Sequence, residues 1–94
     1  MAALEFVHRF TDCSADGCLS MDTRAPSGTH LEVSVDSDGN VWLSANRAGW
    51  LHLARIAAEL GSSQYEPGFH FHMDPDFRDR SSGRQPAVNL EVAE

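Results

Sequence analysis

Two alternating segments joined by an Asp-Gly turn constrain the fold of this chain more than any other feature. Residues 30–36 (HLEVSVD) and 41–45 (VWLSA) flank the turn sequence Asp-Ser-Asp-Gly-Asn. Period-two alternation on both sides of such a turn is typical of a β-hairpin. A calcium loop is a poor alternative, because Gly39 stands at the fourth position of the stretch rather than the sixth, and Arg47 stands where a glutamate would be needed.

A helix is predicted directly after the hairpin. Asn46 is a favourable N-cap, the helix is expected to run from Arg47 to Leu60, and Gly61 is expected to end it. At 100° per residue, we expect burial of a central apolar stripe and its flanks: Trp50, Leu53, Ala54, Ala57 and Leu60, with Ile56, Leu51 and Ala58 at the edges. The polar strip, expected to face solvent, consists of His52, Arg55 and Glu59. The apolar arc is wider than one sheet requires, so loops or another chain should cover part of it.

Three further segments alternate well enough to be predicted as strands, namely residues 4–10, 68–74 and 87–92. Residues 11–28 and 75–86 are rich in Asp, Ser, Gly and Pro and are predicted as loops, apart from an apolar island at 18–21 that fits a short strand. The order of elements predicts a single α+β domain over residues 1–94. We expect a two-layer sandwich in which one helix packs on a four- to five-stranded, mostly antiparallel sheet.

The charge balance excludes several classes of function. The chain has 94 residues with 14 acidic and 7 basic side chains, all arginine, for a net charge of -7. This charge opposes binding to nucleic acid through its phosphates and suits a neutral or basic protein partner. No apolar stretch is long enough to span a membrane, and no secretory signal precedes the first strand, so we expect a cytoplasmic protein. Cys13 and Cys18 are then expected to be reduced thiols with a structural or incidental role.

Only one constellation has the spacing of a ligand set, His70-x-His72-x-Asp74. Residues two apart on a strand point the same way, so two imidazoles and a carboxylate could hold iron or zinc. Cys13 and Cys18 could instead join the two histidines in a structural zinc site. Strand alternation alone also explains the pattern as an ordinary solvent-facing polar side. We therefore expect no cofactor and no catalytic centre, and keep a metal-binding protein or small metalloenzyme as the alternative.

From Asn46 onward the chain resembles a family of bacterial polymorphic toxin systems, immunity protein 32. The resemblance rests on the helix that begins Asn-Arg-Ala-Gly-Trp-Leu-His-Leu-Ala, the strand Gly-Phe-His-Phe-His-Met-Asp at 68–74 and the closing strand from 86 to 91. It covers about half of the chain. The resemblance implies a small α+β protein that neutralises a toxin encoded beside it, by occluding the toxin rather than by catalysis.

The leading interpretation is therefore a small acidic binding protein whose partner is a cognate toxin, expected to be basic. The acidic residues gather in turns and on outward strand faces, where opposite potentials would speed association. We expect the partner-binding surface to lie at one edge of the sheet and to contain His70, His72, Asp74, Asp76, Asp36 and Asp38. The wide apolar arc of the helix also leaves a homodimer open.

Overall fold

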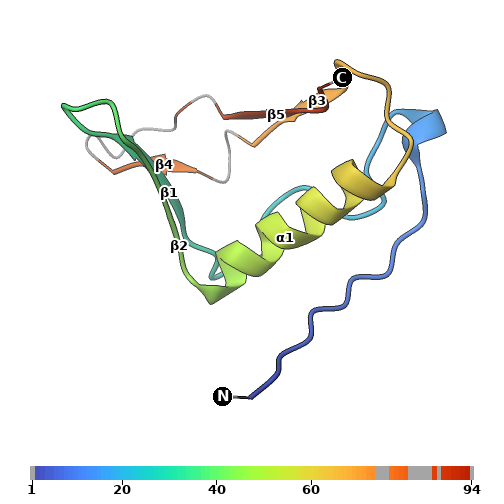
Figure 1. Ribbon diagram of the computed structural model, residues 1–94, viewed down its shortest axis with the longest axis horizontal. Coiled ribbons are helices and arrows are strands. Elements are labelled where there is room, and N and C mark those ends of the chain that lie inside the picture. Colours follow the sequence, from blue (N-terminus) through green and yellow to red (C-terminus); the bar gives the residue numbers. More distant parts are fainter. Residues whose placement is uncertain (1, 74–76, 81–85, 87, 94) are drawn as a thin grey trace.

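The protein has an α+β fold, as the order of elements predicted. The computed structural model describes residues 2–73, 77–80, 86 and 88–93. In chain order the elements are η1 (Ser14–Asp16), β1 (Leu31–Val35), β2 (Val41–Ala45), α1 (Arg47–Ser62), β3 (His70–His72), β4 (Arg78–Asp79) and β5 (Asn89–Glu91). The β1–β2 hairpin and α1 diverge from the point where β2 meets the helix, and β3 and β5 lie across from α1 (Figure 1). None of the described segments forms a helix with the length and apolarity that crossing a bilayer requires.

The strands form two sheets in the described part of the chain. The first has three strands in the order β2-β1-β4, and the second pairs β3 with β5. The β1–β2 pair is antiparallel and runs from Leu31 opposite Ala45 to Val35 opposite Val41. The β1–β4 pair is parallel, whereas β3 and β5 are antiparallel. A single four- to five-stranded sheet is therefore not confirmed among these residues.

The hairpin forms where the sequence predicted it. The backbone N–H of Asp36 donates to the carbonyl of Asn40 at 3.0 Å, and the N–H of Gly39 donates to the carbonyl of Asp36 at 3.1 Å. Gly39 has a φ of 83°, a left-handed conformation that glycine adopts without the steric cost of a side chain. Local turn chemistry is therefore sufficient to close this hairpin.

The two strands predicted in the N-terminal part were wrong, whereas the predicted loop was correct. Residues 4–10 and 18–21 form no strand, and none of the backbone groups of residues 2–11 pairs with another backbone group of the described chain. The regular structure within residues 11–28 is limited to η1, as expected of a loop. The island at 18–21 instead supplies Leu19 and Met21, which pack against the core.

The C-terminal strands are shorter than predicted. The segment 68–74 contributes the three residues of β3, and the segment 87–92 contributes the three residues of β5. The segment 75–86, predicted as a loop, contains β4 next to the buried side chain of Phe77. The rest of that segment, apart from Arg80 and Pro86, lies outside the described residues.

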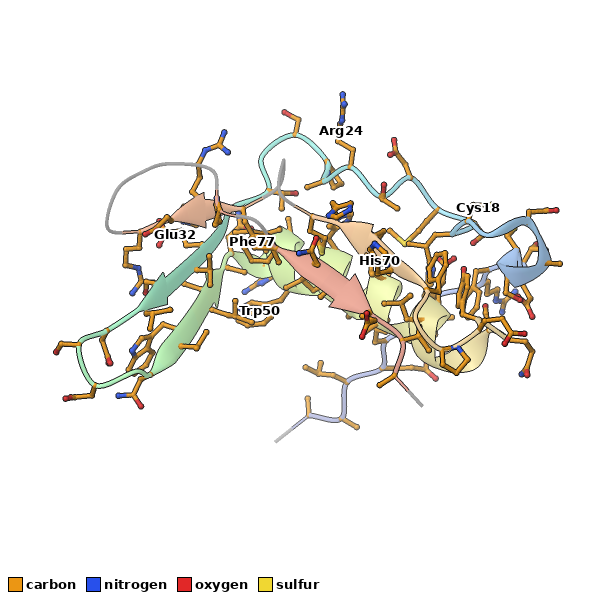
Figure 2. All side chains as sticks on the ribbon, turned by 90° about the horizontal axis from the view of Figure 1, so that it is seen from above. Cys18, Arg24, Glu32, Trp50, His70 and Phe77 are labelled. Carbon is orange, nitrogen blue, oxygen red and sulfur yellow. The ribbon has the colours of Figure 1, made fainter. Side chains whose placement is uncertain are left out.

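The predicted buried face of α1 was only partly right. Ile56, predicted at its edge, is buried, and Leu53 and Leu60 of the predicted stripe pack against the core. The helix residues that are buried are Gly49, His52, Ile56 and Glu59, whereas the side chain of Trp50 is 49% exposed. At 100° per residue, the centre of the buried face lies about 115° around the helix from the centre of the predicted stripe. Trp50 lies on the side of α1 opposite the segment that carries Cys18 and Arg24 (Figure 2).

The reason is that residues 8–23 cover the predicted polar strip and satisfy its polar atoms. Glu59 accepts hydrogen bonds from the side chain of His8 and from Ser20. The ring Nε2 of His52 lies 3.2 Å from the carbonyl of Thr23 and donates to it. A buried polar group is tolerated when it is hydrogen-bonded, so His52 and Glu59 are buried although they are polar, while Arg55 is partly exposed.

The predicted start of α1 was correct, whereas the predicted end was not. Asn46 is the N-cap, and its side-chain Oδ1 accepts from the N–H of Gly49 at 2.9 Å, as predicted. At the other end the helix continues through Gly61 to Ser62, and Ser63 is the C-cap. The buried core that α1 helps to form consists of Leu31, Ile56, Met73 and Phe77.

Candidate protein-binding surface

The turn of the β1–β2 hairpin is organised around the carboxylate of Asp36. Its Oδ1 accepts from the backbone N–H of Asp38 and of Asn40, both at 2.9 Å. Its Oδ2 accepts from the side-chain amide of Asn40 at 3.0 Å and from the indole N–H of Trp42 at 3.1 Å. These donors, led by Trp42, lower the pKa of Asp36 to about 2. The turn therefore carries a permanent negative charge at neutral pH.

The same network fixes an exposed aromatic side chain. Trp42 is 54% exposed, yet its indole N–H is held by Asp36. On the other face of the hairpin, Val35 and Val41 are opposite each other and are 62% and 65% exposed. The end of the hairpin thus presents apolar surface on both faces and two exposed carboxylates, Asp36 and Asp38, at its turn. We call this surface the hairpin end, made of residues 35–42.

His70 and His72 lie side by side on the exposed side of β3, as the alternation predicted. Their ring centroids are 5.4 Å apart and the ring planes are nearly perpendicular, at 88°. The Nδ1 of His70 lies 3.1 Å from the carbonyl of Gly68, and the Nδ1 of His72 contacts the side-chain oxygen of Asn89 on β5. Each ring is oriented by a neighbouring oxygen, and both project from the smaller sheet.

The structure does not bring the predicted partner-binding residues into one surface. His70 and His72 lie on β3 in the two-stranded sheet, while Asp36 and Asp38 lie at the turn of the three-stranded sheet. The two groups are far apart in both views (Figures 1 and 2). Asp74 and Asp76 lie outside the described residues. The expectation that acidic turns and histidines share one edge is therefore wrong for the four residues that the structure places.

The metal-binding alternative stays a prediction. The described residues contain no group of three or more His, Cys, Asp or Glu side chains arranged to hold a metal ion, and Asp74 of the proposed triad is outside them. Cys13 and Cys18 are both free, and burial raises the pKa of the Cys13 thiol. The thiol of Cys18 points toward the carbonyl of Cys13, at 3.9 Å, so the pair belongs to the turn around η1.

A shallow depression beside β1 was not foreseen from the sequence. It has a volume of about 540 Å³, and residues 24–31 and Arg78 line it. Two arginines, Arg24 and Arg78, and the imidazole of His30 are among the lining groups. His30 is paired with Glu32 at 2.9 Å, and Arg80 pairs with the same carboxylate at 2.9 Å. The parallel pairing of β4 with β1 places Arg78 opposite Glu32, and no sequence pattern joins this strand to the loop that carries Arg24.

Comparison of this chain with protein-family models, with curated proteins and with solved structures found no match. The resemblance to immunity protein 32 therefore stays a prediction, and the case for a function rests on the surface itself.

Proposed function

We propose that this protein is a small acidic binding protein that neutralises a cognate toxin by binding and occluding it, in a bacterial cytoplasm. The resemblance to immunity protein 32 is one reason, and the net charge of -7 is another, since it favours a basic partner. The observation that carries the proposal is the hairpin end, where a fixed and exposed Trp42 stands beside the carboxylates of Asp36 and Asp38.

Trp42 has the properties of an anchor residue. Hot spots of protein interfaces are enriched in tryptophan, which buries a large apolar area and still needs one hydrogen bond. Binding usually costs about 0.5–1.5 kcal/mol for each mobile side chain that becomes fixed. Because Asp36 already holds the indole, much of this cost is met before the partner arrives.

The negative charge of the hairpin end would orient a basic partner as it approaches. Asp36 is ionised at any physiological pH, because its pKa is about 2, and Asp38 is exposed beside it. Opposite potentials steer encounter and suppress wrong partners more than they add affinity. Asp36 and Asp38 would therefore orient the partner during encounter, and Trp42 would contribute most of the binding free energy.

The proposal predicts that a large exported protein with a toxin domain is encoded next to this gene, and the test is binding to that toxin domain. We expect Trp42→Ala to weaken binding by about 10- to 100-fold, the range of a hot-spot truncation, in calorimetric titration. The matched control is Trp50→Ala, because Trp50 is the same residue type with a similar exposure, 49% against 54%. It should change affinity by less than about threefold.

Growth provides a second readout of the same proposal. A bacterial host that expresses the toxin domain should survive when the wild-type protein is co-expressed and should die with Trp42→Ala. Equal loss of affinity in both tryptophan variants would contradict the assignment to the hairpin end. The absence of any rescue by the wild-type protein would contradict the immunity function itself.

A further inference from the structure

We propose that two copies of this chain associate through the open edge of β2, with the two Leu43 residues facing each other across a two-fold axis. This inference is independent of the proposed toxin partner and is tested on the purified protein alone. It involves Val41 and Trp42 of β2 and the turn 36–40, so the proposed contact overlaps the hairpin end.

Within residues 2–73, 77–80, 86 and 88–93, no segment pairs with the outer edge of β2. β2 is the outer strand of the three-stranded sheet in the described chain, and its sequence Val-Trp-Leu-Ser-Ala contains no charged residue and no proline. Val41, Trp42 and Leu43 are 65%, 54% and 51% exposed. Natural proteins usually protect such an edge with charges, proline or a covering segment, because unpaired N–H and C=O groups invite another strand.

The backbone hydrogen bonds of the hairpin show which groups of β2 face this edge. The N–H of Asp36 donates to Asn40, and the N–H of Asn46 donates to His30. Hydrogen-bonded and non-bonded pairs alternate along an antiparallel ladder, so the even-numbered residues of β2 bond to β1. The N–H and C=O groups of Val41, Leu43 and Ala45 therefore point outward and are available to a second strand.

This arrangement fits an antiparallel pair of identical strands. With Leu43 on the axis, Leu43 bonds to Leu43 of the second copy and Val41 bonds to Ala45 of the second copy. Val41, Leu43 and Ala45 share one face of β2, the face that packs with Leu31, Val33 and Val35 of β1. The apolar face of one hairpin would therefore continue into that of the other, and no like charges would meet within the paired strands.

The same register favours the pairing electrostatically. It places the start of α1, with the exposed Arg47, beside the acidic turn 36–40 of the second copy. A helix N-terminus and an arginine both attract carboxylates, and Asp36 is ionised because its pKa is about 2. The pairing is thus complementary although each chain carries a net charge of -7.

The accessible surface of the single chain exceeds the average for a compact monomer of the same mass. The accessible area is 6779 Å², whereas a folded monomer of 10.3 kDa exposes about 5,400 Å². The excess, about 1,400 Å², is more than the roughly 800 Å² that each side of a standard interface buries. The radius of gyration is 14.6 Å, against about 12 Å for a compact domain of this length.

Some of the excess accessible area comes from the extended residues 2–10. These residues do not cover β2. His8 is tied to Glu59, and the segment runs along α1, away from the hairpin (Figure 1). The open edge of β2 and the half-exposed Trp50 lie on the same side of the molecule (Figure 2). A second copy is therefore the occupant that the edge fits.

The test is sedimentation equilibrium of the full chain over about 1–100 µM, the range of dissociation constants worth about 5.5–8.2 kcal/mol. The wild-type protein should sediment with twice the mass of 10.3 kDa. Leu43→Lys puts two like charges on the axis, and Leu43→Pro removes an outward N–H without removing a β1–β2 bond. Both variants should be monomers, and far-UV circular dichroism should show that each is folded.

Two matched variants separate this contact from other modes of association. Val35→Lys changes the same apolar face but lies on β1, away from the edge, and should leave the dimer intact. Leu4→Lys changes the N-terminal segment and should also leave it intact. A monomeric wild-type protein, or a folded Leu43→Lys variant that still dimerises, would overturn the proposal. If only Leu4→Lys abolished the dimer, the N-terminal segment of the second copy, and not its β2, would be the partner of this edge, which would also overturn the proposal.

Discussion

Two carboxylates show how donors, rather than exposure, decide the charge state of an acidic residue in this protein. Glu59 is 1% exposed, and burial alone would raise its pKa, but hydrogen bonds from His8 and Ser20 outweigh burial and hold the pKa below its ordinary value. Asp36 is exposed and its pKa is lowered by donors from one turn. One carboxylate therefore joins distant segments, while the other orders a local loop.

Replacement of Glu59 should destabilise the protein. Glu59→Gln replaces an ionised acceptor of three hydrogen bonds by a neutral amide, and it leaves the donors of His8 and Ser20 imperfectly paired. We expect a loss of about 1–3 kcal/mol in the free energy of unfolding, measured by urea titration. The control is Glu66→Gln at an exposed position, which should change the free energy by less than about 0.5 kcal/mol.

The same variant should alter the dependence of stability on pH. A carboxyl whose folded pKa is lowered stabilises the native state above its unfolded pKa, and this stability is lost as pH falls through the folded pKa. For Glu59 the loss begins below the ordinary value of 4.5. The wild type should lose more stability than Glu59→Gln on acidification from pH 6 to pH 3. Parallel pH profiles for the two proteins would contradict this role of Glu59.

At the scale of elements, the junction between β2 and α1 depends on a glycine. A Cβ built on Gly49 would lie 2.6 Å from the carbonyl oxygen of His30 and 2.9 Å from side-chain atoms of Ala45 and Leu31. The neighbours are a backbone oxygen and packed core atoms, which cannot move aside cheaply. The close approach of hairpin and helix therefore requires the absence of a side chain at this position.

Gly49→Ala and Gly61→Ala should have opposite effects on stability. Both glycines lie in α1, where alanine is the better helix former by about 1 kcal/mol. At Gly61 nothing lies near the added Cβ, so thermal unfolding should show stabilisation of about 0.5–1 kcal/mol. At Gly49 overpacking should outweigh propensity and destabilise by about 1–3 kcal/mol. Stabilisation by both variants would disprove the tight contact.

The elements that the sequence predicts well are those encoded by adjacent residues. The hairpin at 31–45 and the Asn46 N-cap depend on turn and capping chemistry within a few positions. The buried face of α1 does not, because His52 and Glu59 are buried through contacts with Thr23, Ser20 and His8. Those partners lie in an aperiodic segment, and no local pattern links them to the helix.

The candidate site was also predictable only where it depends on residues close together in the sequence. The acidic turn at 36–38 and the exposed histidines of β3 follow from alternation. The fixed orientation of the Trp42 indole could not be predicted, since it depends on a hydrogen bond to Asp36. The distance between the hairpin end and β3 depends on how strands pair, which residue spacing does not determine.

For the whole molecule, the buried core is small relative to the surface. Among the described residues, the core cluster contains four buried side chains, those of Leu31, Ile56, Met73 and Phe77, and the accessible area of the chain is 6779 Å². Small domains bury a low fraction of their surface and gain modest stability from it. Association of two chains would add buried area where the single chain lacks it.

If association and folding are coupled, stability should depend on protein concentration. Mass action then raises the thermal midpoint of the wild type by about 3–4 °C for each tenfold increase in concentration, from the average unfolding entropy of a chain of this length. Differential scanning calorimetry at several concentrations measures this shift. Leu43→Lys should show a midpoint that does not vary with concentration. A concentration-independent midpoint in the wild type would exclude coupled folding and dimerisation.

The bond between His8 and Glu59 joins positions 51 residues apart, and this separation sets an order of events during synthesis. Translation at about 5–20 residues per second places roughly 3–10 s between the appearance of the imidazole and that of its carboxylate. In that interval residues 2–23, with the apolar side chains of Leu4 and Phe6, have no helix to lie against. A nascent chain of this kind is a natural substrate for chaperones that bind extended apolar segments near the ribosome.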